Sequence, residues 1–150
     1  MSKKYDFAKR QDWLGLLAVA PQAEVSDGLD RLGLSPAFTW LRKPQIGSVM
    51  VRGRQGGTGA PFNLGEMTVT RASLTLEDGR VGHGYVQGRA LQKAEHCALI
   101  DALMQGEEAT RIADQILEPI AKSLAAQKAE TAGKAAQTKV DFFTMARGED

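Results

Sequence analysis

The first candidates for chemistry in this chain lie in a glycine-rich segment, residues 53–65. Its candidate anion contacts are Arg54, Gly56, Gly57, Thr58 and Gly59. Successive backbone N–H groups in conformations that glycine permits can form a concave anion site, and arginine pairs readily with phosphate or carboxylate. Together with Arg71, this segment predicts contact with an anionic ligand.

A structural interpretation fits the same segment. No Lys-Ser or Lys-Thr pair ends it, so it is not a Walker loop, and it leads into a predicted strand, whereas a dinucleotide-binding loop opens a helix. Ten of the 16 glycines lie between Gly47 and Gly88, and glycine also serves tight turns and close packing against protein. Ligand contact and simple turn or partner contact therefore both stay open.

The remaining candidate residues predict neither catalysis nor metal binding. His83 is expected to point outward from a strand, while His96 and Cys97 are neighbours on a predicted helix, where their side chains diverge by about 100°. Two histidines and one cysteine give no metal-ligand spacing. Glu95 and Asp101 do not share a helical face. We therefore expect no nucleophile–base pair, no catalytic residue and no metal site.

Charge is distributed unevenly along the chain, although its formal net value is only +1. Residues 42–89 contain seven basic and three acidic side chains, and residues 90–150 contain seven basic and ten acidic ones. The glycine-rich middle is thus also the basic part, which favours an anionic ligand or partner there. A nucleic-acid-binding surface is normally more basic, so no nucleic-acid partner is expected.

The order of the predicted elements indicates an α+β fold. Apolar residues at helical spacing predict a helical hairpin within residues 1–34. Alternating apolar and polar residues then predict an antiparallel sheet of three or more strands over about residues 37–87, interrupted near Pro44 and at the loop 53–65. The Asp78-Gly79 pair between two alternating runs is typical of a β-hairpin turn.

Helices are expected after the sheet. The segment 89–130 predicts several, and the first of them is apolar on almost every side and should be buried against the sheet. Residues 131–150 are interpreted as a polar tether that ends in an extended apolar tail. The anchors of that tail are Phe142, Phe143 and Met145, which suit docking on the chain's own domain or on another chain.

The composition bounds the class of protein. A chain of 150 residues fits a single domain, residues 1–150, that can bury a sizeable core. The lone Cys97 cannot form an internal disulfide, which favours a reducing compartment. No signal peptide is expected, since residues 1–13 lack the apolar run of one, and no apolar run in the sequence is long enough for a bilayer. A cytoplasmic location without a membrane partner is the expectation.

Several longer motifs occur in a fixed order along the chain. They are RQGGTGAPF at 54–62, GEMTVTRA at 65–72, VQGR at 86–89, AEHCALIDAL at 94–103 and VDFFTMARG at 140–148. In order and spacing they resemble the PhnG family, small subunits of the bacterial phosphonate carbon–phosphorus lyase system. The resemblance runs from about Arg10 to Gly148.

The resemblance implies a place in a multi-subunit complex with two copies of its core subunits. The implied partners are PhnI, PhnH and PhnJ, with PhnL and PhnK as further components. The complex transfers an alkylphosphonate to the ribose anomeric carbon of ATP with release of adenine. ATP is then the substrate of the complex, and the iron–sulfur cluster and S-adenosylmethionine belong to a partner subunit, so this chain alone is expected to bind no cofactor.

Two hypotheses on the role of the chain follow. In the first, it is a non-catalytic or accessory subunit of the carbon–phosphorus lyase core complex. In the second, it contributes directly to an active site, and its Gly/Arg loop binds triphosphate or phosphonate at a subunit interface.

Overall fold

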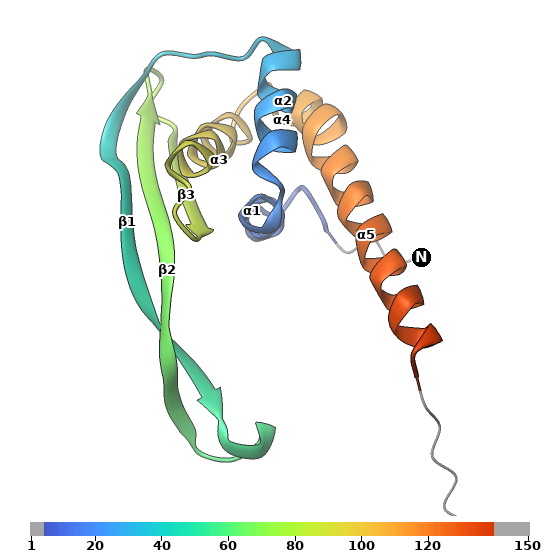
Figure 1. Ribbon diagram of the computed structural model, residues 1–150. Coiled ribbons are helices and arrows are strands. Elements are labelled where there is room, and N and C mark those ends of the chain that lie inside the picture. Colours follow the sequence, from blue (N-terminus) through green and yellow to red (C-terminus); the bar gives the residue numbers. More distant parts are fainter. Residues whose placement is uncertain (1–4, 140–150) are drawn as a thin grey trace, which may run out of the picture.

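The computed structural model describes residues 5–139 and confirms the α+β fold. Three antiparallel strands form one sheet in the order β1-β2-β3, with an N-terminal helical pair and C-terminal helices beside it (Figure 1). The strands are β1 (Phe38–Arg54), β2 (Pro61–Leu76) and β3 (Val81–Gln87). The predicted apolar tail, residues 140–150, lies outside the described residues.

The helical pair consists of α1 (Arg10–Val19) and α2 (Gln22–Leu32). The chain turns at Pro21, which supplies the extended conformation between the helices. Gly33 ends α2 in the left-handed region with φ 62°, as expected of a glycine after a helix. Both helices bury their apolar faces in one core, which includes Trp13, Leu16, Leu17, Val25, Leu29 and Leu32.

The first two strands are longer than the sequence predicts. β1 is continuous through Pro44, with register shifts between Trp40 and Arg42 and between Arg42 and Gln45. β1 lies at an edge of the sheet, where proline and bulges are tolerated because fewer ladder hydrogen bonds are needed. The predicted loop 53–65 is also wrong, because β1 and β2 pair as far as Arg54 and Pro61 and leave only residues 55–60 as a connection.

The third helix lies directly against β3. The Asp78-Gly79 turn forms as predicted, with Gly79 at φ 88°, and carries the chain into β3. Gly82 and Gly84 then face α3 (Leu91–Leu103), whose Ala98 and Ala94 carbonyls occupy the space that a Cβ would need. This close approach lets α3 bury nearly all of its C-terminal half, as its apolar sequence predicts.

The last helices lead away from the core. α4 (Ala109–Ile112) continues through a π-helical turn, η2 (Ala113–Leu117), into α5 (Glu118–Gln137). Pro119 has no N–H for the helical ladder, and it lies directly after the π-helical turn, where the hydrogen-bond pattern of the helix already changes. Ile120 is buried and Leu124 half-buried, but residues 125–138 are all exposed. The start of the predicted tether is therefore helical.

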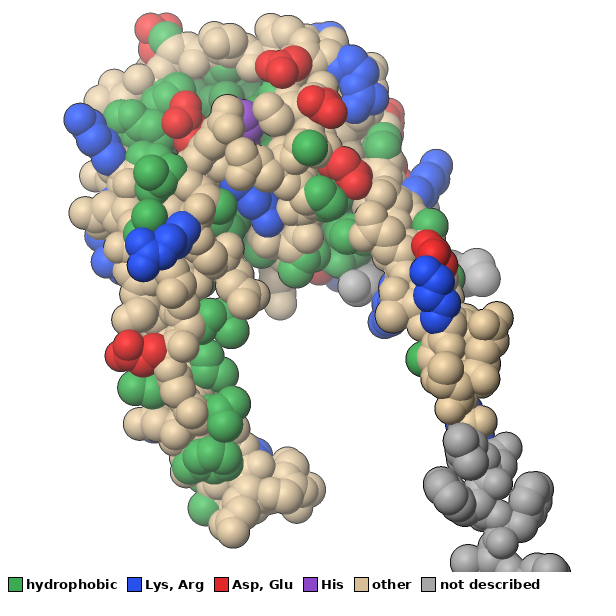
Figure 2. Space-filling view, in the orientation of Figure 1, with side chains coloured by type: hydrophobic (Ala, Val, Ile, Leu, Met, Phe, Trp, Pro, Cys, Tyr) green, Lys and Arg blue, Asp and Glu red, His purple; other side chains and the backbone are tan. Residues whose placement is uncertain are grey.

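Two projections extend from the body of the molecule. One is α5; the other is a two-stranded hairpin, residues 44–68, which we call the arm (Figure 1). No arm residue is buried. The space-filling view shows the arm and α5 standing on opposite sides of an open gap (Figure 2). Among residues 5–139, no helix is long and apolar enough to cross a membrane.

Candidate functional site

The glycine-rich segment forms the tip of the arm. Gly56 and Gly57 have φ values of 59° and 83°, and the Gly59 N–H donates to the Gln55 carbonyl at 2.8 Å. A Cβ on Gly59 would lie 2.6 Å from that carbonyl oxygen. Turn geometry thus accounts for these three glycines, since two need a left-handed backbone and one a close approach.

The two predicted anion-binding arginines are far apart. Arg54 lies at the tip, where its Nη1 donates to the Gly59 carbonyl at 3.2 Å, and Thr58 is exposed beside it. Arg71 lies at the base of the arm, paired with Gln45 on β1 and Tyr85 on β3. Ten residues of β2 separate the pairing positions, or about 33 Å of strand. One chain therefore cannot place both arginines on one small anion.

Arg71 instead belongs to a polar surface on the outer side of the sheet, away from the helices. Two rows of cross-strand neighbours form it, and we call it the cationic face: Arg42, Ser73 and His83 in one row, Gln45, Arg71 and Tyr85 in the other. Neither row contains a carboxylate, and Arg42 donates to the Gln45 side chain at 3.3 Å. Arg42 and Arg71 form no ion pair with a carboxylate among residues 5–139, and two such guanidinium groups favour an anionic ligand or partner.

The cationic face also contains a pair that the sequence analysis missed. The Ser73 hydroxyl and the His83 Nδ1 lie 2.8 Å apart. A hydroxyl and an imidazole are therefore within hydrogen-bond distance, contrary to the expectation that no such pair occurs. Among residues 5–139, however, no carboxylate accepts a hydrogen bond from the ring of His83. The pair lies on an exposed strand surface, and it lacks the third group that orients a catalytic imidazole. Its present role is a cross-strand hydrogen bond.

The buried side of the sheet is organised around Asp101. Its side chain is fully buried and accepts hydrogen bonds from four donors. Arg10 donates through Nη2 (2.7 Å) and Nε (3.0 Å), the indole N–H of Trp13 lies at 2.8 Å, and the backbone N–H of His83 at 2.8 Å. The hydrogen bond to Asp101 raises the pKa of Arg10. A carboxylate with four donors holds the fold together and has no free lone pair for catalysis.

The two helical candidates have different surroundings. Cys97 is buried, and burial raises the pKa of its thiol to about 12, which keeps it protonated and unreactive at neutral pH. His96 is half-buried, and its Nδ1 is buried without a hydrogen-bond partner among residues 5–139. Within the described part of the chain, no cluster of histidine, cysteine and carboxylate residues could hold a metal ion.

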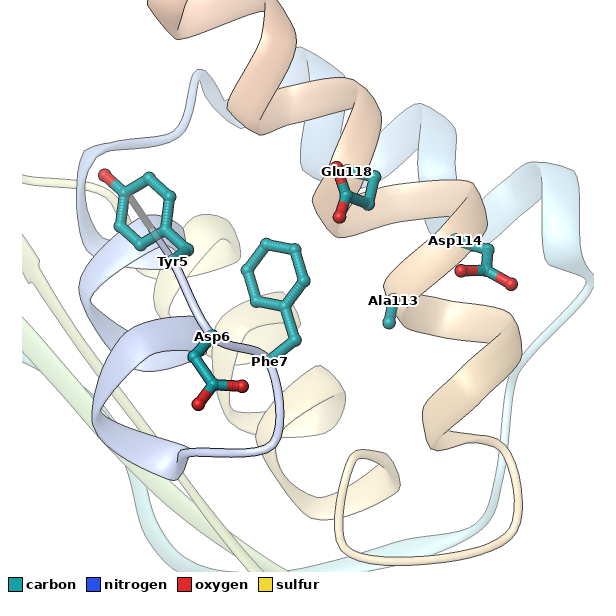
Figure 3. Close-up of a pocket in the computed structure, with 6 residues that line it drawn as sticks. All are labelled: Tyr5, Asp6, Phe7, Ala113, Asp114 and Glu118. Carbon is teal, nitrogen blue, oxygen red and sulfur yellow. The ribbon is translucent and has the colours of Figure 1, made fainter. Parts of the chain in front are cut away.

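A pocket of about 380 Å³ lies between the N-terminal segment and the π-helical turn (Figure 3). Tyr5 and Phe7 contribute stacked rings, and carboxylates come from Asp6, Asp114 and Glu118. The Asp6 carboxylate already accepts a hydrogen bond from the Ala8 N–H (3.2 Å) and forms an ion pair with Lys9. Three carboxylates around one pocket repel phosphate, so an anionic substrate is not expected here.

The arm has a different chemistry from the body, because it exposes apolar side chains. Met50 is 52% exposed, Phe62 46% and Leu64 66%. Figure 2 shows hydrophobic side chains along the arm, on the side that faces the gap. Apolar groups gathered on a projecting hairpin are typical of a protein interface. The other predicted docking residues, Phe142, Phe143 and Met145, lie outside the described residues.

Comparison with known proteins gives two matches that span most of the chain. The family model of "Phosphonate metabolism protein PhnG" matches residues 8–148. A curated protein of Rhizobium meliloti (strain 1021), "Alpha-D-ribose 1-methylphosphonate 5-triphosphate synthase subunit PhnG", is 43% identical over 143 residues. The alignment covers 95% of this chain and 92% of that relative.

Proposed function

The chain belongs to the PhnG family of phosphonate metabolism proteins, and on that premise we propose that it is an accessory subunit of the carbon–phosphorus lyase core complex. In this role it supports transfer of an alkylphosphonate to the ribose anomeric carbon of ATP, with release of adenine. The observation that carries the proposal is the arm, which projects from the body and buries none of its residues.

The physical argument starts from the instability of an isolated hairpin. Two strands without a covered face are marginal in water, and exposed strand edges invite pairing with other chains. An arm of this length therefore suits a protein that works within an assembly. Among the described residues, the candidate catalytic groups are buried and saturated, as Asp101 is, or lie on the outer face of the sheet without a supporting pocket, as the half-buried Ser73 and the exposed His83 do.

The expected assembly supplies the groups that this chain does not. We propose PhnI, PhnH and PhnJ as core partners, in a complex with two copies of each core subunit, and PhnL and PhnK as further components. ATP is the substrate of the complex. The iron–sulfur cluster and S-adenosylmethionine are assigned to a partner subunit. The protein is expected to act in the cytoplasm.

Shortening the arm tests this proposal. Val49 and Met67 are cross-strand partners whose main-chain groups face each other, so replacing residues 50–66 by Asn-Gly closes the hairpin with a two-residue turn. We expect the body to fold with its normal melting temperature and co-purification with the other subunits to fall at least tenfold. Full assembly of this variant would overturn the proposed role of the arm.

Deleting residues 140–150 tests the second predicted docking element separately. The aromatic anchors Phe142 and Phe143 are expected to contribute to capture of a partner, so the deletion should also weaken co-purification. An intact complex after the deletion would contradict docking by the tail and would leave the arm as the main contact.

The cationic face favours the second candidate function, a direct contribution to an active site. Arg42 and Arg71 could hold a triphosphate or phosphonate that a partner subunit covers. In an assembled complex, the double variant Arg42→Ala, Arg71→Ala should then lose turnover while keeping its subunits. Arg54→Ala is the matched control, because it removes a distant guanidinium. Equal activity of both variants and the wild type would support the purely accessory role.

A further inference from the structure

The sheet has a vacant position beside the outer part of β2. β3 ends at Gln87, which pairs with Val69, whereas β2 continues outward to Pro61. The last hydrogen bond on this side runs from the Gly88 N–H to the Thr68 carbonyl at 2.8 Å. Beyond it, residues 61–68 present about 26 Å of strand edge to which no strand among the described residues pairs.

The main-chain groups along this edge point into the vacancy. Successive residues of an antiparallel strand direct their N–H and C=O groups to alternate sides. The Thr68 carbonyl points toward β3, as its bond with Gly88 requires. Two residues further out, the N–H and C=O of Glu66 must therefore point the same way. β1 pairs with the opposite edge of β2 except at the register shift beside Leu64, so the vacancy is one-sided.

The vacant position is shaped to receive side chains as well. A groove of about 520 Å³ lies there, lined on the arm by Val51, Leu64 and Met67 and at the end of β3 by Gln87 and Gly88. Gly65 lines it too, and a Cβ built on Gly65 would meet nothing within 4 Å. A large apolar side chain of an added strand has room to lie over this glycine.

We propose that an extended segment of another subunit adds to the edge of β2 residues 61–68, in line with β3, and completes a three-stranded sheet along the arm. This inference rests on the proposed function, because it requires a partner subunit. Main-chain hydrogen bonds provide the attachment, and alternate apolar side chains of the segment fill the groove.

Charge identifies the occupant as a different, acidic chain. The arm and the sheet at its base carry Arg42, Lys43, Arg52, Arg54 and Arg71 against the single carboxylate of Glu66. Two copies of the arm placed side by side would bring like charges together, which is destabilising. A segment with carboxylates flanking its apolar residues has the complementary charge and pairs well with these arginines.

Two substitutions at one position separate strand addition from side-chain contact. In Glu66→Pro, the donor into the vacancy is replaced by a ring, and no main-chain hydrogen bond with β1 is lost. In Glu66→Ala, the carboxylate and its exposed hydrogen bond from Ser48 Oγ (3.4 Å) are removed, as they are in the proline variant, but the main-chain N–H remains. On co-expression with the other subunits, we expect Glu66→Pro to reduce co-purification at least tenfold and Glu66→Ala to change it less than twofold. Equal capture of the proline variant and the wild type would overturn the inference.

Amide hydrogen exchange of the wild-type chain tests strand addition independently, even if Glu66→Pro fails to fold. In the wild-type complex, the amides of Glu66 and Thr68 should exchange at least tenfold more slowly than in the free chain. Unchanged exchange in an assembled complex would overturn strand addition and leave the subunit role intact, whereas loss of all co-purification by the wild type would defeat the subunit role itself.

The same measurement on the free chain decides between occupants. Protection of these amides that rises with protein concentration would identify a second copy of the chain instead. Protection in the free chain that is lost on deletion of residues 140–150 would identify its own C-terminal segment. Either result would overturn the assignment to an acidic partner, which predicts fast exchange at all concentrations in the free chain.

Discussion

In the body, β3 lies directly against α3, and helices cover one side of the sheet. In the arm, the same sheet continues as two strands with neither face covered (Figure 1). The body satisfies a buried carboxylate with four donors, whereas the arm leaves Phe62 and Leu64 exposed. The difference separates two tasks along one sheet: the body provides the stability of the free chain, and the arm remains available to a partner.

The strongest test of this division is Asp101→Ala in the body. The substitution leaves the buried indole N–H of Trp13 and the part-buried backbone N–H of His83 without an acceptor, at about 1–3 kcal/mol each. We expect unfolding to become easier by about 3 kcal/mol, which corresponds to a melting temperature lower by about 6–12 °C. Thermal unfolding followed by circular dichroism measures the effect.

Glu95→Ala is the matched control for Asp101→Ala. Glu95 lies on the same helix and is only half-buried, so its loss should change the free energy of unfolding by less than about 0.5 kcal/mol. Equal melting temperatures for the two variants would mean that the Asp101 cluster does not stabilise the body, and the comparison with the arm would fail.

A pair of glycine substitutions compares the two regions directly. In Gly84→Ala, the new methyl group meets the Ala94 carbonyl, and neither backbone can move without separating β3 from α3. Such overpacking costs about 1–3 kcal/mol. In Gly65→Ala, the methyl group enters open space, so the free chain should change by less than about 0.5 kcal/mol. Chemical denaturation of both variants, analysed for midpoint and slope, tests this difference.

A reversed order of the two effects would break the comparison, since it would place a packing constraint in the arm. A second prediction follows for Gly65→Ala if a partner strand fills the groove. The variant should then weaken assembly while leaving the free chain unchanged.

Much of the fold was predictable because its signals are local. Gly33 and Pro21 mark the ends of two helices in any context, and the Asp78-Gly79 pair fixes a hairpin by its own backbone preference. The continuity of β1 through Pro44 was missed because the bulges that accommodate this proline depend on pairing with β2, which no local pattern encodes. For the same reason, the ends of the two arm strands, residues 53–54 and 61–65, were predicted as part of a loop.

The site was less predictable, because its contacts join distant parts of the chain. Arg10 and Asp101 are 91 residues apart, and nothing near either residue indicates the partner. The Ser73–His83 pair is different, since its signal was present. Leu76 pairs with Arg80 across the Asp78-Gly79 turn, so counting three residues back along each strand places Ser73 opposite His83. Extending the hairpin register would have found it.

The acid stability of the body provides a smaller test. Arg80 pairs with Asp78 at 2.7 Å and with Glu108 at 3.1 Å, which ties the β2–β3 turn to the segment after α3. The pKa of Asp78 is lowered mainly by the backbone N–H of Arg80, and that of Glu108 mainly by a hydrogen bond from its own backbone N–H and then by Arg80. Because both carboxyl groups titrate lower when folded, their contribution is complete at neutral pH and is lost as the pH falls below their unfolded values.

The variant Arg80→Ala should therefore be less stable than the wild type at pH 7, and the difference should shrink as the solution is acidified through pH 4 toward pH 3. Urea unfolding at a series of pH values measures this convergence. A constant difference over the whole range would mean that Arg80 acts only through its packing over Gly106 and its hydrogen bond to the Leu103 carbonyl at 3.3 Å.

The smallest expected effect is that of Arg54→Ala at the tip of the arm. Its guanidinium makes one exposed hydrogen bond, to the Gly59 carbonyl, and an exposed bond of this kind contributes little because water replaces it. The free energy of unfolding of the free chain should change by less than about 0.5 kcal/mol. Urea unfolding of the free chain is the measurement, and Asp101→Ala is the positive control. A loss of more than about 1 kcal/mol would mean that the tip unfolds with the body as one cooperative unit, so that the arm could not be treated as an independent recognition element.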